Sequence, residues 1–159
     1  MKNFILNALR ENARISAAEI AELGNFETSA VEKTIKELED SHIIRGYTAI
    51  CDGSVDDGKV KAVIEVKVTP NRDGGFDQVA QRIARYPEVS DLCLISGSFD
   101  LLITINGKSL NEVANFVASK LATIDGVQST STGFMLKKYK ESGRIMEDFE
   151  DYERLKVTP

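Results

Sequence analysis

The sequence predicts an α+β fold in two parts. Residues 1 to about 45 have apolar side chains at helical spacing and two Ser-x-x-Glu capping motifs, which predicts three short helices. Residues 60–141 change between strand-like and helix-like patterns in the order β-α-β-β-α-β. The segment between them, 51–59, is rich in Gly and Asp and predicts a linker. The chain therefore divides into a helical domain with its linking strand (1–50), a linker, and a second domain (60–141).

The helical part has the pattern of a helix-turn-helix. Ser16 and Glu19 form a capping box that opens the second helix, and Gly24-Asn25 supplies a left-handed residue to end it. Ser29 and Glu32 suggest another capping box at the start of the third helix. In that helix a buried face is predicted at i, i+4 and i+7, namely at Val31, Ile35 and Leu38.

Two features mark the end of this helical part. His42, the only histidine, is expected to end the third helix in a left-handed conformation. The following residues, 43–50, are rich in β-branched and aromatic side chains and predict a strand that leaves the helices.

The second part has the order of a ferredoxin-like βαββαβ unit. Strict alternation predicts a strand at 60–68, and apolar spacing predicts a helix from Phe76 to Ile83 that stops before Pro87. A third capping motif, Ser109 to Glu112, starts the second helix, and Asp125-Gly126 makes a turn before a last strand from Val127 to about Tyr139.

The stretch 92–106 predicts a hairpin that is apolar on both faces. Leu92, Leu94, Leu101, Ile103 and Ile105 suit one face, whereas Cys93, Ile95 and Leu102 lie on the other. A sheet with two apolar faces is covered on both sides. We expect this chain's own helices on one face and a second copy of the chain on the other, with this hairpin as the central pair. Gly97 is expected to give the turn a positive φ.

Composition limits the classes of protein. With 42% hydrophobic and 28% charged residues, the chain is an ordinary globular protein, and no apolar run reaches membrane-spanning length. The two cysteines, Cys51 and Cys93, lack metal-ligand spacing and are expected to be reduced cytoplasmic thiols. The acidic tail, 142–159, has Ile145, Phe149 and Tyr152 at helical spacing and predicts an amphipathic helix.

Several motifs together resemble the Lrp/AsnC family of transcription regulators. They are Asn12 to Ser16 (N-A-R-x-S), the helix from Val31 to Leu38 followed by Ile44-Arg45-Gly46-Tyr47, the turn Gly97-Ser98-Phe99-Asp100 (G-x-[YF]-D), and Asp125-Gly126-Val127 with the Ser/Thr-rich stretch after it. The resemblance covers roughly residues 2–140. It implies a plain or winged helix-turn-helix domain joined to a ferredoxin-like effector domain, homodimers built sheet to sheet, and further assembly into octamers.

The resemblance also implies two sites. Double-stranded DNA would meet the third helix through Thr28, Ser29, Lys33, Thr34 and Lys36. A small-molecule effector, an amino acid or a related metabolite, would lie against Gly97, Ser98, Phe99, Asp100, Thr130 and Thr132. The Asp100 carboxylate suits an ammonium group, and exposed amides near Gly97 suit a carboxylate. No cofactor, metal site or membrane partner is expected.

Two alternatives to a DNA-binding regulator remain open. Residues 1–50 contain six Lys/Arg and eight Asp/Glu, which opposes phosphate binding and leaves room for an oligomeric metabolite-binding module with weak or lost DNA binding. Haem-pathway decarboxylases share the two-domain layout, but the second domain here has no histidine and no paired acid and base, so no catalytic residues are assigned.

Overall fold

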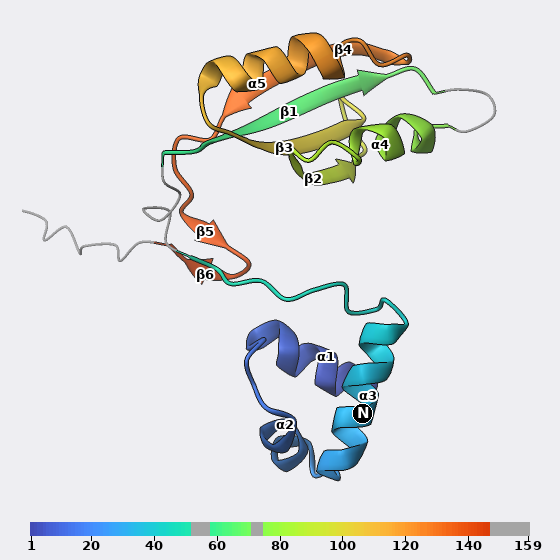
Figure 1. Ribbon diagram of the computed structural model, residues 1–159, viewed down its shortest axis with the longest axis vertical. Helices are drawn as coiled ribbons and strands as arrows, with labels where there is room; N and C mark the ends of the chain where they lie inside the picture. The colour runs from blue at the N-terminus through green and yellow to red at the C-terminus, as the bar shows by residue number, and fades with distance from the viewer. Residues whose placement is uncertain (52–57, 71–74, 147–159) are drawn as a thin grey trace, which may run out of the picture. The chain divides into compact units, whose positions relative to one another are not determined.

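The computed structural model describes residues 1–51, 58–70 and 75–146 (Figure 1). Contacts divide the chain into two units, residues 1–50 and residues 51–159. The first unit is helical, and the second contains an antiparallel four-stranded sheet with helices. The predicted α+β fold is therefore confirmed. Within the described ranges, none of the helices has the length and apolarity of a membrane-spanning segment.

Three helices form the first unit: α1 (Lys2–Glu11), α2 (Ala17–Gly24) and α3 (Thr28–Asp40). Each helix contributes fully or almost fully buried side chains to one small core, namely Ile5, Ile20, Ala21, Val31 and Leu38. The short connection between α2 and α3 gives the predicted helix-turn-helix.

The turn between these helices depends on two neighbouring residues. Asn25 ends α2 in the left-handed conformation (φ 52°), as the sequence predicted for one of the pair Gly24-Asn25. Gly24 is needed for a different reason. A Cβ there would lie 2.3 Å from Cε2 of Phe26 and 2.9 Å from Cε1 of Phe4. The missing side chain lets the edge-to-face pair of Phe4 and Phe26 pack against the helix end.

One predicted cap is present at the start of α2 and another is absent from α3. The Ser16 hydroxyl accepts from the Glu19 amide at 3.2 Å, and the Glu19 carboxylate accepts from the Ser16 amide at 2.8 Å. The capping box predicted at Ser29 and Glu32 is wrong, because α3 already begins at Thr28 and its N-cap, Glu27, makes no side-chain cap bond. Ser29 therefore lies inside the first turn.

The end of α3 agrees with the sequence, but the segment that follows does not. His42 has φ 57°, and the next amide, Ile43, donates to the Leu38 carbonyl at 2.9 Å, which closes the helix. The predicted strand at 43–50 is wrong for the isolated chain, since these residues form no sheet pairing in the described part of the protein. A β-favouring segment needs a partner strand, and the described chain supplies none.

The second unit is built on the sheet order β2-β3-β1-β4. Its strands are β1 (Val60–Val68), β2 (Val89–Leu94), β3 (Leu101–Gly107) and β4 (Val127–Phe134), all paired antiparallel. This is the ferredoxin-like arrangement. The hairpin β2–β3 was predicted to be the central pair, which is wrong: β1 and β3 are central, and β2 lies at an edge (Figure 1).

Helices cover one face of this sheet. Buried residues alternate along β1 and β3 and pack with residues of α4 (Asp77–Ile83), α5 (Leu110–Phe116) and the π-helical turn Val117–Leu121. The core contains Ala62, Ile64, Val66, Val68, Val79, Ile83, Leu101, Ile103, Ile105, Val113, Phe116, Leu121 and Ile124. Phe116, the last residue of α5, is 4% exposed and is the one aromatic side chain among these core residues.

The other face of the sheet has no covering element among the described residues of its own unit. The register places Val63 opposite Thr104, Glu65 opposite Leu102, and Leu102 opposite Cys93. Val63 and Leu102 are only half-buried, so this face combines apolar and polar groups, and the described residues of its own unit leave it open.

The last part of the described chain differs from the sequence prediction. The strand expected to reach Tyr139 ends at Phe134. A small hairpin follows, β5 (Lys140–Glu141) and β6 (Arg144–Ile145), with Ser142 and Gly143 both at positive φ. The predicted helix from Ile145 is wrong at its start, because Ile145 belongs to β6. Its remaining positions, Phe149 and Tyr152, lie outside the described residues.

Candidate functional site

The outward side of α3 presents a short polar and basic stripe. Ser29, Lys33 and Lys36 recur at i, i+4 and i+7, and all three are exposed. The buried side of the same helix carries Val31 and Leu38. Because the second helix of a helix-turn-helix is the one that enters the major groove, these residues are suitably placed to face DNA.

Thr34 does not belong to this stripe. It was predicted to face outward, but its exposed fraction is 4% and its hydroxyl donates to the Ala30 carbonyl at 2.7 Å. The buried face of α3 is centred on i, i+3 and i+7 (Val31, Thr34, Leu38), whereas Ile35 is only half-buried. A threonine is tolerated there because the bond to Ala30 satisfies its hydroxyl. Thr34 is therefore excluded as a direct DNA contact.

Carboxylates of α3 flank the basic stripe. Glu32 and Glu39, at i and i+7, follow the adjacent line of the helix surface. Glu39 accepts a hydrogen bond from the Tyr47 hydroxyl at 2.8 Å. Desolvation, and then the hydrogen bond and charge of Glu39, raise the pKa of Tyr47, so the tyrosine remains a neutral donor. Glu37 lies 3.9 Å from the Lys2 ammonium. Two of the flanking carboxylates thus have partners within the first unit.

The first turn of α3 has amide groups directed away from the helix body. Thr28 and Ser29 are exposed, and their amides have no acceptor inside the helix. Since no side chain caps this turn, its partial positive charge is accessible to a phosphate oxygen. Thr28 and Ser29 are therefore at the helix end where a backbone phosphate would bind.

In the second unit, Asp100 lies where the loop after β2 enters β3. Its carboxylate accepts from the Val68 amide at 2.9 Å and from the Lys67 ammonium at 3.0 Å. These groups, the Val68 amide foremost and then Lys67, lower the pKa of Asp100. Asp100 is thus an ionised residue that ties the end of β1 to the start of β3. Each carboxylate oxygen can accept a further bond, so a ligand could still bind there.

The turn before Asp100 is closed by the Ile95 amide, which donates to the Asp100 carbonyl at 2.8 Å. Gly97 and Ser98 are exposed and Phe99 is half-buried. The positive φ predicted for Gly97 is wrong, and a Cβ there would meet nothing within 4 Å. Among the residues that the structure describes, neither backbone conformation nor packing accounts for this glycine.

The structure does not bring the remaining two predicted effector residues to Asp100. Thr130 and Thr132 lie on β4 opposite Val66 and Ile64, so they share the helix-covered face of the sheet. Lys67, the partner of Asp100, has the opposite orientation in β1. The turn and the two threonines therefore belong to different faces of the sheet in one chain.

Sequence analysis missed Lys67. The contact of Lys67 with Asp100 depends on how β1 pairs with β3, and the residue pattern of neither strand reveals that pairing. Cys51 and Cys93 are exposed free thiols. In the described ranges, no three His, Cys, Asp or Glu side chains are grouped as metal ligands.

Two family models match this chain, one in each unit. Residues 5–45 match a winged helix-turn-helix DNA-binding domain, and residues 61–145 match the Lrp/AsnC ligand-binding domain. The first range contains α2, α3 and most of α1, and the second contains β2, β3, β4 and all of β1 except its first residue.

Curated relatives match along almost the whole chain. The HTH-type transcriptional regulator YugG of Bacillus subtilis is 44% identical over 157 residues, which are 98% of this chain and 95% of that protein. The regulator FL11 of Pyrococcus horikoshii is 30% identical over 141 residues, covering 89% and 91% of the two chains.

Solved structures agree with these relatives. The transcriptional regulator NMB0573 of Neisseria meningitidis, solved as a complex with L-Met, superposes with a TM-score of 0.66 at 27% identity and covers 88% of this chain and 90% of that one. Escherichia coli AsnC, at 21% identity and a TM-score of 0.66 over 88% and 93% of the two chains, shares the fold. From its family matches and its relatives, the chain belongs to the Lrp/AsnC family of transcriptional regulators.

Proposed function

We propose that this regulator contacts DNA through the exposed stripe of α3 and that a free amino acid, bound at the 97–100 turn, modulates the binding. The observation that carries the DNA part is the separation of charges on α3. Lys33 and Lys36 are exposed on the side opposite the buried residues, and Glu37 and Glu39 have partners elsewhere in the unit.

The contact would combine backbone and base recognition. The uncapped first turn, with Thr28 and Ser29, would hold a phosphate and fix the position of the helix. Lys33 and Lys36 lie one and two turns further along the same side and would reach the groove. The net acidity of residues 1–50 weakens binding at each helix, so two helices acting together on two half-sites would supply the affinity.

A homodimer would bring those helices together. The open face of the sheet supports this proposal, because Val63 and Leu102 are half-buried beside Cys93 on a face that nothing in the described part of the unit covers. Sheet-to-sheet packing of two copies would bury these groups. Association of dimers into octamers would bring further faces together, including the Thr130 and Thr132 side of β4.

The amino-acid effector rests on the chemistry of the turn and on the relative solved with L-Met. The Asp100 carboxylate has acceptor capacity for an ammonium, and the exposed backbone at Gly97 and Ser98 is accessible to a carboxylate. Phe99 supplies apolar surface beside them. Thr130 and Thr132 would join the site only from a neighbouring chain, because they lie on the other face within one chain.

A DNA-binding titration tests the proposed function. Fluorescence anisotropy with the DNA upstream of the protein's own coding region should show saturable binding that weakens with salt. Repeating it with each free amino acid at millimolar concentration should identify one that changes the apparent Kd, because an effector must favour one assembly over another. Absence of binding to any upstream DNA at low salt would instead support an oligomeric metabolite-binding module.

A further inference from the structure

Tyr47 connects the segment that follows α3 back to the last turn of that helix. Its hydroxyl donates to Oε1 of Glu39 at 2.8 Å. The helix end is closed without this bond, because the amides of Ile43 and Ile44 donate to the Leu38 carbonyl at 2.9 and 3.0 Å. Tyr47 is also 50% exposed, so it contributes little to the core. The distinctive effect of its hydroxyl is to fix where the Glu39 carboxylate lies.

Without that hydrogen bond, Glu39 would have another partner within reach. It follows Lys36 by three residues, and side chains at this spacing are neighbours on the surface of a helix. A carboxylate and an ammonium so placed attract each other, and a lysine held in such a pair is less available to a phosphate. In the structure this pair is not formed, and neither Lys33 nor Lys36 has an ion pair with any residue in the described ranges.

A weaker contact acts on the other lysine of the helix in the same way. Glu37 follows Lys33 by four residues but lies 3.9 Å from the Lys2 ammonium of α1. Both members of that pair are at least half exposed, so the contact contributes little. The bond from Tyr47 to Glu39 is shorter and has a charged acceptor, which makes it the stronger of the two restraints.

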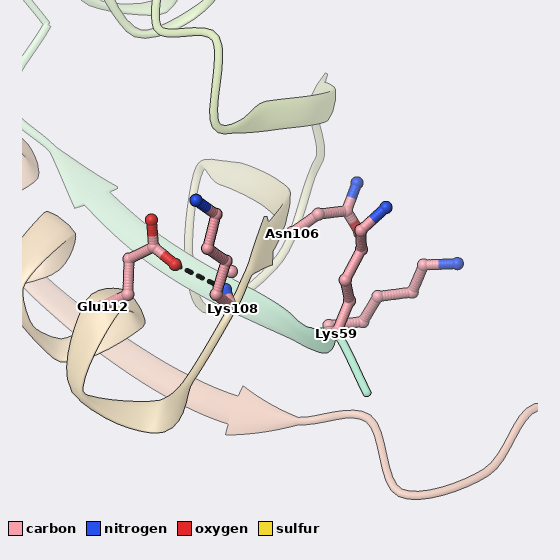
Figure 2. A pocket seen from close by; sticks show the side chains of 6 residues that line it. Lys59, Asn106, Lys108 and Glu112 are labelled. Carbon is pink, nitrogen blue, oxygen red and sulfur yellow. Dashed lines mark hydrogen bonds between the residues drawn. The ribbon is translucent and has the colours of Figure 1, made fainter. Parts of the chain in front are cut away.

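Lysines of the second unit lack this arrangement. Lys59 and Lys108 line a depression of about 290 Å³ that also contains Glu112 (Figure 2). There the Glu112 carboxylate accepts a hydrogen bond from the backbone amide of Lys108 itself. It is therefore held next to the lysines and opposes an approaching phosphate. On α3, by contrast, Glu39 is held by a residue from outside the helix.

This difference bears on the contact between α3 and DNA proposed above, on which the inference rests. We propose that Tyr47 is a positioning residue for DNA binding: its hydroxyl holds Glu39 away from Lys36 and leaves that lysine available to a phosphate oxygen. Tyr47 itself need not touch DNA. The role matters on this helix because α3 contains four carboxylates and only two lysines.

A double-mutant cycle on the full-length protein tests the inference, with DNA from upstream of the protein's own coding region as the probe. Tyr47→Phe removes the hydroxyl and changes no charge. By fluorescence anisotropy it should bind roughly two- to fivefold more weakly than wild type, since a weak Glu–Lys pair would compete in each chain of a dimer. Glu39→Gln removes the competing charge, and in that background Tyr47→Phe should cause no further loss. Tyr139→Phe, in the second unit, is the matched control and should bind like wild type.

A purely structural role for Tyr47 gives a different result in the same cycle. The amide oxygen introduced by Glu39→Gln can still accept a hydrogen bond from the tyrosine hydroxyl. A tyrosine that only holds the chain segment in place would therefore lose affinity equally in both backgrounds, and that outcome would overturn the proposal. Wild-type affinity in Tyr47→Phe would also overturn it. Thermal midpoints close to that of wild type show that the variants are folded.

The variant Lys33→Gln/Lys36→Gln separates failure of this inference from failure of the proposed function. If it binds DNA weakly while Tyr47→Phe binds like wild type, α3 contacts DNA and only the role of Tyr47 is wrong. If it binds DNA as tightly as wild type, the α3 contact itself is wrong and the inference falls with it.

Discussion

Asp100 and Lys67 join the two central strands of the effector domain at one end. The Lys67 ammonium lies 3.0 Å from Oδ1 of Asp100, and the Val68 amide donates to Oδ2 at 2.9 Å. The turn at residues 97–100 thus has a structural role even without a ligand, because Asp100 ties the end of β1 to the start of β3. A ligand that bonds to Asp100 would compete with Lys67 or share the carboxylate with it.

Because of this contact, the stability of the effector domain should depend on pH, and the direction of the effect can be predicted. The Val68 amide and Lys67 lower the folded-state pKa of Asp100 below its ordinary value of 3.8. The stabilisation is fully present above that ordinary value and is lost as the pH falls through the lowered pKa. Asp100→Asn should therefore be less stable than wild type at pH 7, with the difference shrinking towards pH 3. Urea unfolding across this pH range measures it, and a difference that grows at low pH would contradict the assignment.

Two serines that each begin a Ser-x-x-Glu motif should contribute differently to stability. Ser16 caps α2 through reciprocal bonds with Glu19, whereas Ser29 lies inside α3 and caps nothing. Ser16→Ala should lower the free energy of unfolding by about 1 kcal/mol. Ser29→Ala should change it by less than about 0.5 kcal/mol. Chemical denaturation of both variants decides this, and equal effects would mean that Ser29 is a cap after all.

Adding a methyl group should change the stability of the protein at one glycine and leave it unchanged at another. Gly24→Ala should destabilise the first unit, although alanine favours helices by about 1 kcal/mol, because the new Cβ would overlap the Phe26 ring. Gly97→Ala meets no atom within 4 Å and should leave the thermal midpoint unchanged. A Gly97→Ala protein that is equally stable but no longer responds to the amino acid would support close approach of the ligand backbone to this residue.

A charged substitution on the open face of the sheet should weaken the self-association of the protein. Leu102→Glu places a charge among half-buried apolar groups on the proposed contact and should shift the protein towards monomer in multi-angle light scattering. Leu110→Glu is the matched control, because Leu110 is 56% exposed on α5 and already faces solvent. If both variants keep the wild-type mass, the face around Leu102 is not the dimer contact.

The sequence predicted those elements whose pattern is local. The alternation from Val60 to Val68, the cap at Ser16 and the left-handed His42 each depend on near neighbours, and each is present. Element order was also enough to predict the ferredoxin-like fold, because few topologies satisfy βαββαβ with short connections.

The wrong predictions are those whose outcome depends on contacts that a sequence pattern does not show. Thr34 was placed outside because i, i+4 and i+7 spacing and i, i+3 and i+7 spacing differ by one residue, and the bond to Ala30 that allows its burial is not visible in a pattern. The position of β2 at an edge follows from pairing of β1 with both β3 and β4. The contact of Lys67 with Asp100 depends on the pairing of β1 with β3, which the residue pattern of neither strand reveals.

The central claim is that the basic stripe of α3 holds this regulator on DNA, and the salt dependence of binding tests it most directly. The slope of log Kobs against log salt concentration is measured for wild type, for Lys33→Gln/Lys36→Gln, and for the charge-matched control Arg82→Gln/Arg85→Gln on and after α4. Loss of two lysine charges per chain removes four from the proposed dimer and should make the slope less steep by about 4, while the control keeps the wild-type slope. An unchanged slope and affinity in the Lys33/Lys36 variant would show that another surface contacts the phosphates, and would contradict the account.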